Sequence, residues 1–213
     1  MKVYDCFLFF NELDILELRL ETLSDHIDYF VLHESTECFS GKAKSLIFKE
    51  NSSRFKRFQD KIIHIVTPNM PPTFETSHIK SQERRWRGEE YQRSAIKNSL
   101  ANCADDDIIL MGDVDEIPLP MDFTALEVWD KIYRFEQLFF YYYLNVRVTY
   151  DSDSDYRWPG TKMGKYSVIK KYNMEQLRRE TKGLQLILPG GWHFSKQGGY
   201  QHTITGTDPP AAQ

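Results

Sequence analysis

Hydrophobic residues near the start of the chain form two different patterns, a run and a regular spacing. Val3–Phe10 is a short, mostly apolar run, which predicts a buried strand. Apolar residues then recur every three or four positions, which predicts an amphipathic helix with Asn11 as its N-cap. The residues of this apolar face are Leu13, Leu16, Leu20, Leu23 and Ile27. The chain therefore begins as a strand followed by a helix.

The alternation of strands and helices continues to residue 111. Further strands are expected at Tyr29–Leu32, Ile62–Val66 and Ile108–Met111, and helices at Ser52–Asp60 and Gln82–Cys103. Strands that alternate with helices form parallel sheets, with right-handed crossovers and helices on both faces. This half of the chain therefore predicts a parallel sheet of at least four strands.

The pattern changes after Pro120 and predicts a mixed or antiparallel second half. The expected elements are a helix at Phe123–Trp129, strands at Ile132–Phe135, Leu138–Val148 and Ser167–Lys170, a helix at Met174–Arg179, and strands at Leu184–Leu188 and Trp192–Phe194. The fold class is therefore α/β, with one Rossmann-like domain over residues 1–204 made of halves 1–118 and 119–204. The small and polar tail, residues 205–213, resembles a boundary to further domains of a longer chain.

Composition narrows the classes of function and location. The formal net charge of −4 leaves no excess of Lys and Arg to neutralise phosphates, which argues against general nucleic-acid binding. Three scattered cysteines predict a reducing compartment without a disulfide framework. No signal-peptide pattern and no apolar run of membrane-spanning length is present in the sequence. We therefore expect a cytoplasmic protein without a membrane span.

An acidic stretch follows the strand at Ile108–Met111. Gly112 allows the chain to leave the strand, and Asp113 and Asp115 follow where ligands bind in open α/β sheets. Residues i and i+2 of an extended segment point the same way, so the two carboxylates would repel each other unless a cation lay between them. Oxygen ligands of this kind suit Mg²⁺ or Mn²⁺ shared with substrate phosphates. The alternative is a polar turn whose acids are solvated.

Eight motifs in order resemble glycosyltransferase family 17. They are Asp5–Glu12, the leucine helix that follows it, Val31–Ser35, Phe39–Lys42, Gln92–Arg93, Asp107–Pro118, Trp158–Lys162 and Gly191–Ser195. The resemblance covers about residues 3 to 199, and its best-known member adds N-acetylglucosamine to N-glycans. It implies a GT-A fold, a nucleotide-sugar donor, a divalent cation and inversion at the anomeric carbon.

The metal and donor residues follow from this resemblance. Asp115 is expected to coordinate Mn²⁺ or Mg²⁺ directly, and Asp113 to contact the metal, its water or the ribose. The resemblance gives His193 the role of completing the metal shell, whereas the alternative is a hydrogen-bonded core histidine. The expected nucleotide-sugar-binding residues are Asn11, Glu34, Lys42, Arg93 and Asp113. Asn11 is equally well explained as an N-cap, and Lys42 as a solvated loop residue.

An inverting reaction needs a carboxylate that takes the proton of the acceptor. Glu116, Asp153, Asp155 and Asp208 are the candidates, and the sequence does not choose among them. Tyr156, Trp158 and Trp192 are candidates for stacking against a sugar, although Trp192 fits core packing equally well.

The resemblance leaves the substrates open. The donor is expected to be a UDP-sugar carrying N-acetylglucosamine, glucose or rhamnose, and the acceptor a glycan or glycoprotein. Animal family members carry a membrane anchor, which this sequence lacks. Its size and abrupt end also resemble the first domain of viral enzymes that glycosylate a capsid protein, which would place the reaction in the host cytoplasm. The rival hypotheses are a non-catalytic carbohydrate-binding domain and a haloacid-dehalogenase-type phosphatase, which also uses Asp-x-Asp.

Overall fold

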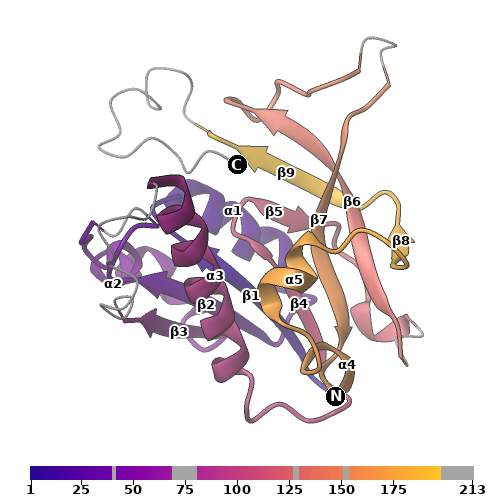
Figure 1. Ribbon diagram of the computed structural model, residues 1–213, viewed down its shortest axis with the longest axis horizontal. Coiled ribbons are helices and arrows are strands. Elements are labelled where there is room, and N and C mark those ends of the chain that lie inside the picture. Colours follow the sequence, from indigo (N-terminus) through magenta and orange to yellow (C-terminus); the bar gives the residue numbers. More distant parts are fainter. Residues whose placement is uncertain (40–41, 69–80, 127–129, 151–153, 198–213) are drawn as a thin grey trace.

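The first half of the chain forms four parallel strands, as its sequence pattern predicts. The computed structural model describes residues 1–39, 42–68, 81–126, 130–150 and 154–197. β1 (Val3–Phe9) lies between β2 (Tyr29–Ser35) and β4 (Ile108–Asp113), and β3 (Ile62–Thr67) pairs with β2, all in parallel (Figure 1). The predicted parallel sheet is therefore confirmed.

The second half extends the same sheet with mixed pairing. β7 (Arg157–Lys165) is antiparallel to β4 and to β6 (Ile132–Tyr141). β9 (Gly191–Ser195) runs parallel to β6 and antiparallel to the short β5 (Glu116–Pro118). The resulting strand order is β3-β2-β1-β4-β7-β6-β9-β5, with β8 (Gln185–Ile187) paired to β6. The mixed α/β, GT-A-like fold class is therefore confirmed.

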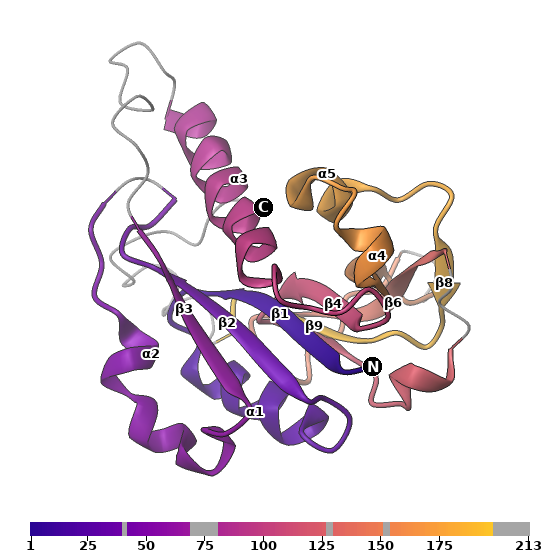
Figure 2. The ribbon, with the colours of Figure 1, turned by 90° about the horizontal axis from the view of Figure 1, so that it is seen from below.

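Helices cover both faces of the parallel strands (Figure 2). One face carries α1 (Leu13–Leu23), α2 (Ile47–Glu50) and the 3-10 helix η1 (Ser52–Phe58). The other carries α3 (Ser81–Ser99), α4 (Tyr166–Ile169) and α5 (Met174–Arg179). No helix among the described residues is both long and apolar enough to cross a bilayer.

Two hydrophobic cores explain why the central strands are apolar at most positions. Phe7 of β1 packs with Leu16 and Leu20 of α1, whereas its neighbour Cys6 packs with Ile96 of α3 on the opposite face. Successive side chains of a strand point to opposite faces, so a sheet covered on both sides needs apolar residues throughout.

Several predicted elements in the second half differ from the structure. The run at 167–170 is helix α4 rather than a strand, because a short apolar run does not distinguish the two. The two strands expected between 132 and 148 are one strand, β6, which continues through a register shift between Arg134 and Glu136 and ends at Tyr141. Residues 142–148 form bends, a turn and an isolated bridge at Arg147 instead of a strand. Of the predicted helix at 123–129, Phe123–Ala125 forms a single 3-10 turn, and 127–129 lie outside the described residues.

Three further differences concern β7, β5 and the start of α1. β7 contains Pro159 and Gly160, which argue against a central strand from sequence alone. β5 includes Pro118, which is tolerated because β5 is the last strand in the sheet order. The N-cap of α1 is Glu12 rather than Asn11, and the Glu12 carboxylate accepts hydrogen bonds from the amides of Phe10 and Asn11.

Gly191 is required where β9 passes β5. Its φ is +102°, and a Cβ atom at this position would lie 2.3 Å from the carbonyl oxygen of Ile117. Gly183 also has a positive φ, +71°, but a Cβ atom there would meet no atom within 4 Å. A side chain at Gly183 would therefore meet only the unfavourable φ, whereas one at Gly191 would also overlap with the backbone of β5.

We expect Gly191→Ala to lower the free energy of unfolding by at least about 3 kcal/mol, because it adds an overlap between backbones to the unfavourable φ. Gly183→Ala is the matched control and should cost only about 1–2 kcal/mol. Urea denaturation of both variants measures this difference. Equal losses would show that β9 does not approach β5 this closely.

Candidate active site

The acidic stretch lies where the parallel strands end. Asp113 is the last residue of β4, Val114 and Asp115 form a turn, and Glu116 begins β5. The carboxyl ends of β1 and β2 lie beside it, which is the ligand-binding edge of open α/β sheets. Because the turn interrupts the extended backbone, the expectation that Asp113 and Asp115 point the same way does not hold.

A buried arginine fixes this turn from the α1 side of the sheet. The Arg19 Nε and Nη2 atoms donate hydrogen bonds of 2.7 and 2.6 Å to the Asp5 carboxylate. Its Nη1 atom donates to the carbonyl oxygens of Asp113, Val114 and Glu116, at 3.0, 3.2 and 2.8 Å. Arg19 and Asp5 are both fully buried. One guanidinium therefore holds the backbone on both sides of Asp115.

The sequence interpretation missed Arg19, although two signals were present. Asp5 lies in the middle of an apolar strand, where an unpaired carboxylate is costly. Arg19 lies four residues after Ile15 and three after Leu16, which places it on the buried face of the helix. A charge of each sign on two buried faces predicts an ion pair between them.

Asp113 is held by two arginines on the α3 and α5 side. Its carboxylate accepts hydrogen bonds from Arg93 at 2.8 Å and from Arg178 at 3.2 Å. Burial alone would raise the pKa of Asp113, but the charges of Arg93 and Arg178 outweigh it and hold that pKa well below its usual range. Asp113 is therefore ionised and already paired with cations.

Arg93, expected to contact the donor, is buried behind Asp113. Besides Asp113, it pairs with Glu89 of α3 and Glu175 of α5, each at 2.9 Å. Arg93 therefore joins two helices to the end of β4. A direct contact between Arg93 and a donor stays a prediction.

The Asp115 side chain, in the turn, lies next to the His193 side chain, on β9. The His193 Nε2 atom is 3.2 Å from the Asp115 Oδ2 atom. His193 is fully buried, whereas the Asp115 side chain keeps 16% of its surface exposed. Burial alone would lower the pKa of His193, but the charge of Asp115 and the hydrogen bond to it raise that pKa above its ordinary value.

This pair fits two ligands of one divalent cation. Ligands placed about 2.1 Å from an ion and at right angles are about 3 Å apart, close to the observed separation. Within the described part of the chain, no group of three or more His, Cys, Asp or Glu side chains is arranged to hold a metal. Asp115 and His193 would therefore supply two ligands, and water and donor phosphates the others.

Glu116 is buried and bound by three donors. Its carboxylate accepts hydrogen bonds from Trp158 Nε1 at 2.6 Å, from the amide of Asp113 at 3.2 Å, and from Arg178. The Thr161 hydroxyl donates to the carbonyl oxygen of Glu116 at 2.9 Å. These contacts explain why the Trp-Pro-Gly-Thr-Lys motif accompanies the acidic stretch, since its side chains hold Glu116 in place.

The other candidates for the catalytic base lie in different settings. Asp155 is partly exposed and pairs with Arg147 at 3.0 Å and Arg157 at 3.2 Å. Asp153 and Asp208 lie outside the described residues, as does the proposed boundary at residue 204. The structure therefore brings only Glu116 close to the Asp113 turn among the described candidates.

Lys162, which the sequence interpretation left unassigned, is a fully buried cation near this site. Its Nζ atom donates hydrogen bonds to the carbonyl oxygens of Pro159 and Gly160, at 3.0 and 2.9 Å. Burial, and to a smaller extent the nearby charge of Arg178, lower the pKa of Lys162 to about 8. Arg178 and Lys162 therefore place two cations beside the carboxylates of this site.

The predicted base- and ribose-binding residues line the ends of β1 and β2. Asn11 and Lys42 are exposed. Glu34 is buried and accepts hydrogen bonds from the Phe48 amide at 2.9 Å and from Lys44 at 3.4 Å, with His64 Nε2 at 3.0 Å. Burial alone would raise the pKa of Glu34, but these partners lower it. Glu34 therefore anchors α2, and its contact with a donor stays a prediction.

Glu12 is a carboxylate near Asp115 that the sequence interpretation treated only as part of a motif. Burial raises the pKa of Glu12, and the neighbouring charge of Asp115 raises it further. The two amide hydrogen bonds to Glu12 act in the opposite direction. Glu12 therefore adds a second carboxylate to the region around Asp115.

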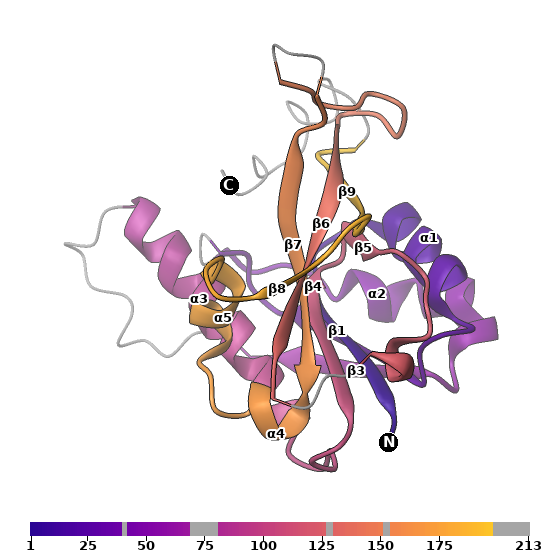
Figure 3. The same cartoon turned by 90° about the vertical axis from the view of Figure 1, so that its right-hand side faces the viewer.

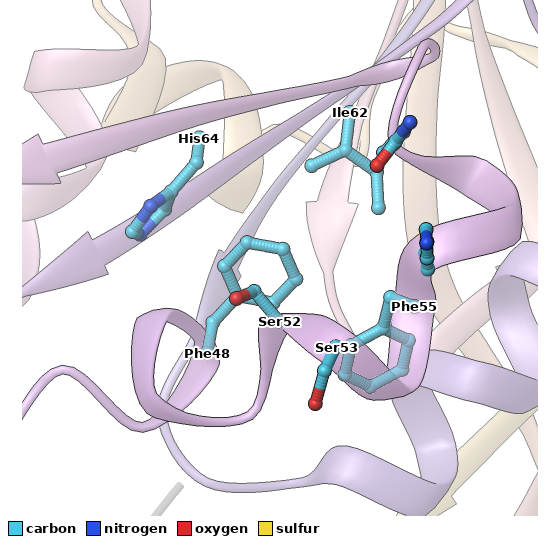
Figure 4. Close-up of a pocket in the computed structure, with 8 residues that line it drawn as sticks. Phe48, Ser52, Ser53, Phe55, Ile62 and His64 are labelled. Carbon is cyan, nitrogen blue, oxygen red and sulfur yellow. The ribbon is translucent and has the colours of Figure 1, made fainter.

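A separate cavity of about 330 Å³ lies between α2, η1 and β3 (Figure 4). Phe48, Phe55 and Ile62 form its apolar wall, and His64 lies at its edge. Through His64 and Phe48 this cavity adjoins Glu34 rather than Asp115. It is therefore distinct from the acidic turn.

Comparisons with known proteins bear out the resemblance seen in the motifs. The model of "Glycosyltransferase family 17" matches residues 1–196. The human and rat beta-1,4-mannosyl-glycoprotein 4-beta-N-acetylglucosaminyltransferases are each 26% identical over 126 residues, which is 56% of this chain. The match spans only 22% of each of these relatives.

Among solved structures, a Francisella tularensis 2-C-methyl-D-erythritol 4-phosphate cytidylyltransferase aligns with a TM-score of 0.42 and 13% identity. The alignment covers 91% of this chain and 90% of that one.

We expect Arg19→Met to lower the free energy of unfolding by about 3–5 kcal/mol, because it leaves the Asp5 charge buried without a partner. Arg54→Met is the matched control: Arg54 pairs with Asp14 and Glu17 at the surface, and its loss should cost less than about 1 kcal/mol. Urea denaturation measures both. Similar losses for the two variants would contradict the role given to Arg19.

Proposed function

The chain belongs to glycosyltransferase family 17, and we propose that it transfers N-acetylglucosamine from a UDP-linked donor to the glycan of a glycoprotein, with the help of a divalent cation. The observation that carries this proposal is the pair formed by Asp115, in the turn that follows β4, and His193, on β9. The sugar and the acceptor are suggested by the names of the mannosyl-glycoprotein N-acetylglucosaminyltransferases. The chain spans about a fifth of their length, so both assignments belong to the proposal.

Asp115 and His193 would hold the cation, for which Mn²⁺ is the better candidate. A carboxylate and an imidazole form a mixed oxygen and nitrogen set, which suits Mn²⁺ better than Mg²⁺. A cation bound there would offset the negative charge that develops on the departing diphosphate. Arg178, which binds Asp113 and Glu116 at this turn, is the arginine we expect to contact the same anionic group.

The transfer itself requires one bond to form and one to break. The acceptor hydroxyl oxygen attacks the anomeric carbon, the bond from that carbon to the diphosphate breaks, and the hydroxyl proton passes to a carboxylate. Glu116 is bound by Trp158 and Arg178, which supports a role in orienting Trp158. Asp153, Asp155 and Asp208 remain predictions for the base of an inverting reaction.

The contacts of Asp113 do not favour the phosphatase alternative. In that class the first aspartate of the motif follows the first strand and must be free to attack a phosphate. Here Asp113 follows β4, and its carboxylate is bound by Arg93 and Arg178. A non-catalytic carbohydrate-binding domain would not consume the sugar-nucleotide donor, whereas an enzyme would.

We expect Asp115→Ala to reduce transfer from UDP-N-acetylglucosamine by roughly 100-fold or more, because the leaving diphosphate loses its charge compensation. Asp106→Ala is the matched control, since Asp106 is exposed and lies near the N-terminus of the chain. The release of UDP at increasing Mn²⁺ concentration measures both variants. Wild-type turnover by Asp115→Ala would refute the proposed metal site.

His193→Ala should raise the Mn²⁺ concentration needed for half-maximal activity, and His193→Asp should restore part of the loss because a carboxylate also coordinates Mn²⁺. The melting temperature of each variant is measured beside the Mn²⁺ activation curve. A lower melting temperature with an unchanged Mn²⁺ requirement would show that His193 is a core histidine instead.

A further inference from the structure

A continuous series of aromatic rings leads from His193 to the surface. The distances between ring centroids are 4.8 Å from Phe139 to His193, 5.6 Å from Tyr156 to Phe139, and 5.4 Å from Tyr150 to Tyr156. Trp158 contacts both His193, at 4.7 Å, and Phe139, at 5.7 Å. We call Phe139, Tyr150, Tyr156 and Trp158 the aromatic ladder.

Strand register places these rings on one face of the sheet. Phe139 of β6 is paired with His193 of β9, and Trp158 of β7 lies two residues after Tyr156, which directly precedes that strand. The neighbouring residues Phe140 and Phe194 point to the opposite face, where they join the main core. The aromatic ladder is therefore additional to the core of the sheet.

The aromatic ladder is open to solvent along its length. Phe139, Tyr156 and Trp158 are partly exposed, and Tyr150 exposes 53% of its surface. In Figures 1 and 3 the far ends of β6 and β7 stand clear of the helices, so the ladder lies on a projecting arm. Rings left partly uncovered beside a site of this kind indicate a surface for a ligand.

Polar groups surround Trp158, at the inner end of the aromatic ladder. Trp158 donates its indole hydrogen to Glu116 at 2.6 Å, and the Arg178 guanidinium lies over the same ring at 5.7 Å. A sugar presents apolar C–H faces surrounded by hydroxyl groups, so it matches rings with charged and hydrogen-bonding side chains at their edges.

We propose that the aromatic ladder is the acceptor subsite. Successive pyranose rings of the glycan would stack on it, one after another, along the series from Tyr150 to Trp158. The inference rests on the proposed function, because the inner end of the ladder contacts His193 of the donor site. This continuity selects a glycan over a protein partner, since a bound glycan would reach the reacting carbon. An oligosaccharide that covers several rings should therefore bind more tightly than a monosaccharide.

The test compares variants with acceptors of different length. Tyr150→Ala and Tyr156→Ala should each raise the KM for a β-mannosyl trisaccharide by roughly three- to tenfold, the size expected for the loss of one ring contact. Tyr150→Phe keeps the ring and should leave the KM near the wild-type value. Tyr172→Ala is the matched surface control, because Tyr172 is 40% exposed and follows α4. The KM for UDP-N-acetylglucosamine should stay unchanged in all four.

A second measurement separates this inference from the proposed function. Binding of the trisaccharide and of mannose is followed by saturation-transfer NMR, without any donor. Loss of trisaccharide binding in Tyr150→Ala, with or without turnover in the wild type, supports the ladder. An acceptor KM or affinity that is the same in Tyr150→Ala, Tyr156→Ala and Tyr172→Ala overturns it. Self-association of the wild type that Tyr150→Ala abolishes would overturn it as well, since the arm would then be a contact between copies.

Discussion

The guanidinium of Arg19 is the contact on which the geometry of the site depends. It lies between the Asp5 carboxylate of β1 and three carbonyl oxygens of the turn at residues 113–116. A turn at the end of a strand ordinarily leaves its carbonyl groups to water. Here one planar side chain with five donors satisfies them from within the protein, which lysine has too few donors in a fixed plane to do. The position of Asp115 is thereby tied to the first strand and the first helix.

A second set of charges holds the same turn from the other face. Arg93 and Arg178 bind Asp113, and Arg178 also binds Glu116. Removing such groups from water is costly, and their mutual attraction compensates only when the geometry is good. Their arrangement leaves Asp115 as the acid of the stretch that faces His193. Asp113 and Glu116, which bind arginines, thus have a structural role, and Asp115 has the proposed role of a metal ligand.

Local patterns were sufficient to predict the parallel half of the sheet. The apolar runs of β1 and β4 and the spacing of Leu16, Leu20 and Leu23 depend on burial over a few residues, which sequence displays directly. The position of the acidic stretch at the strand ends followed from the same patterns and from the order of motifs. These features required no knowledge of distant contacts.

The remaining features depend on residues that are far apart in the chain. Arg19 and Glu116 are 97 positions apart, and Glu116 and Trp158 are 42 apart, so no local pattern connects them. β7 was missed because Pro159 and Gly160 oppose a strand, yet the neighbouring strand shifts its register beside them. The sequence does not distinguish helix α4 from a strand, because its apolar run is too short to show a period.

The most direct measurement of the central claim is pulsed electron paramagnetic resonance of Mn²⁺ bound to the protein with UDP. If Asp115 and His193 hold the cation together, the spectrum of the wild type contains coupling to an imidazole nitrogen, and His193→Asp removes that coupling while Mn²⁺ remains bound. A spectrum of the bound Mn²⁺ without nitrogen coupling in the wild type, or with coupling that persists in His193→Asp, would contradict the account.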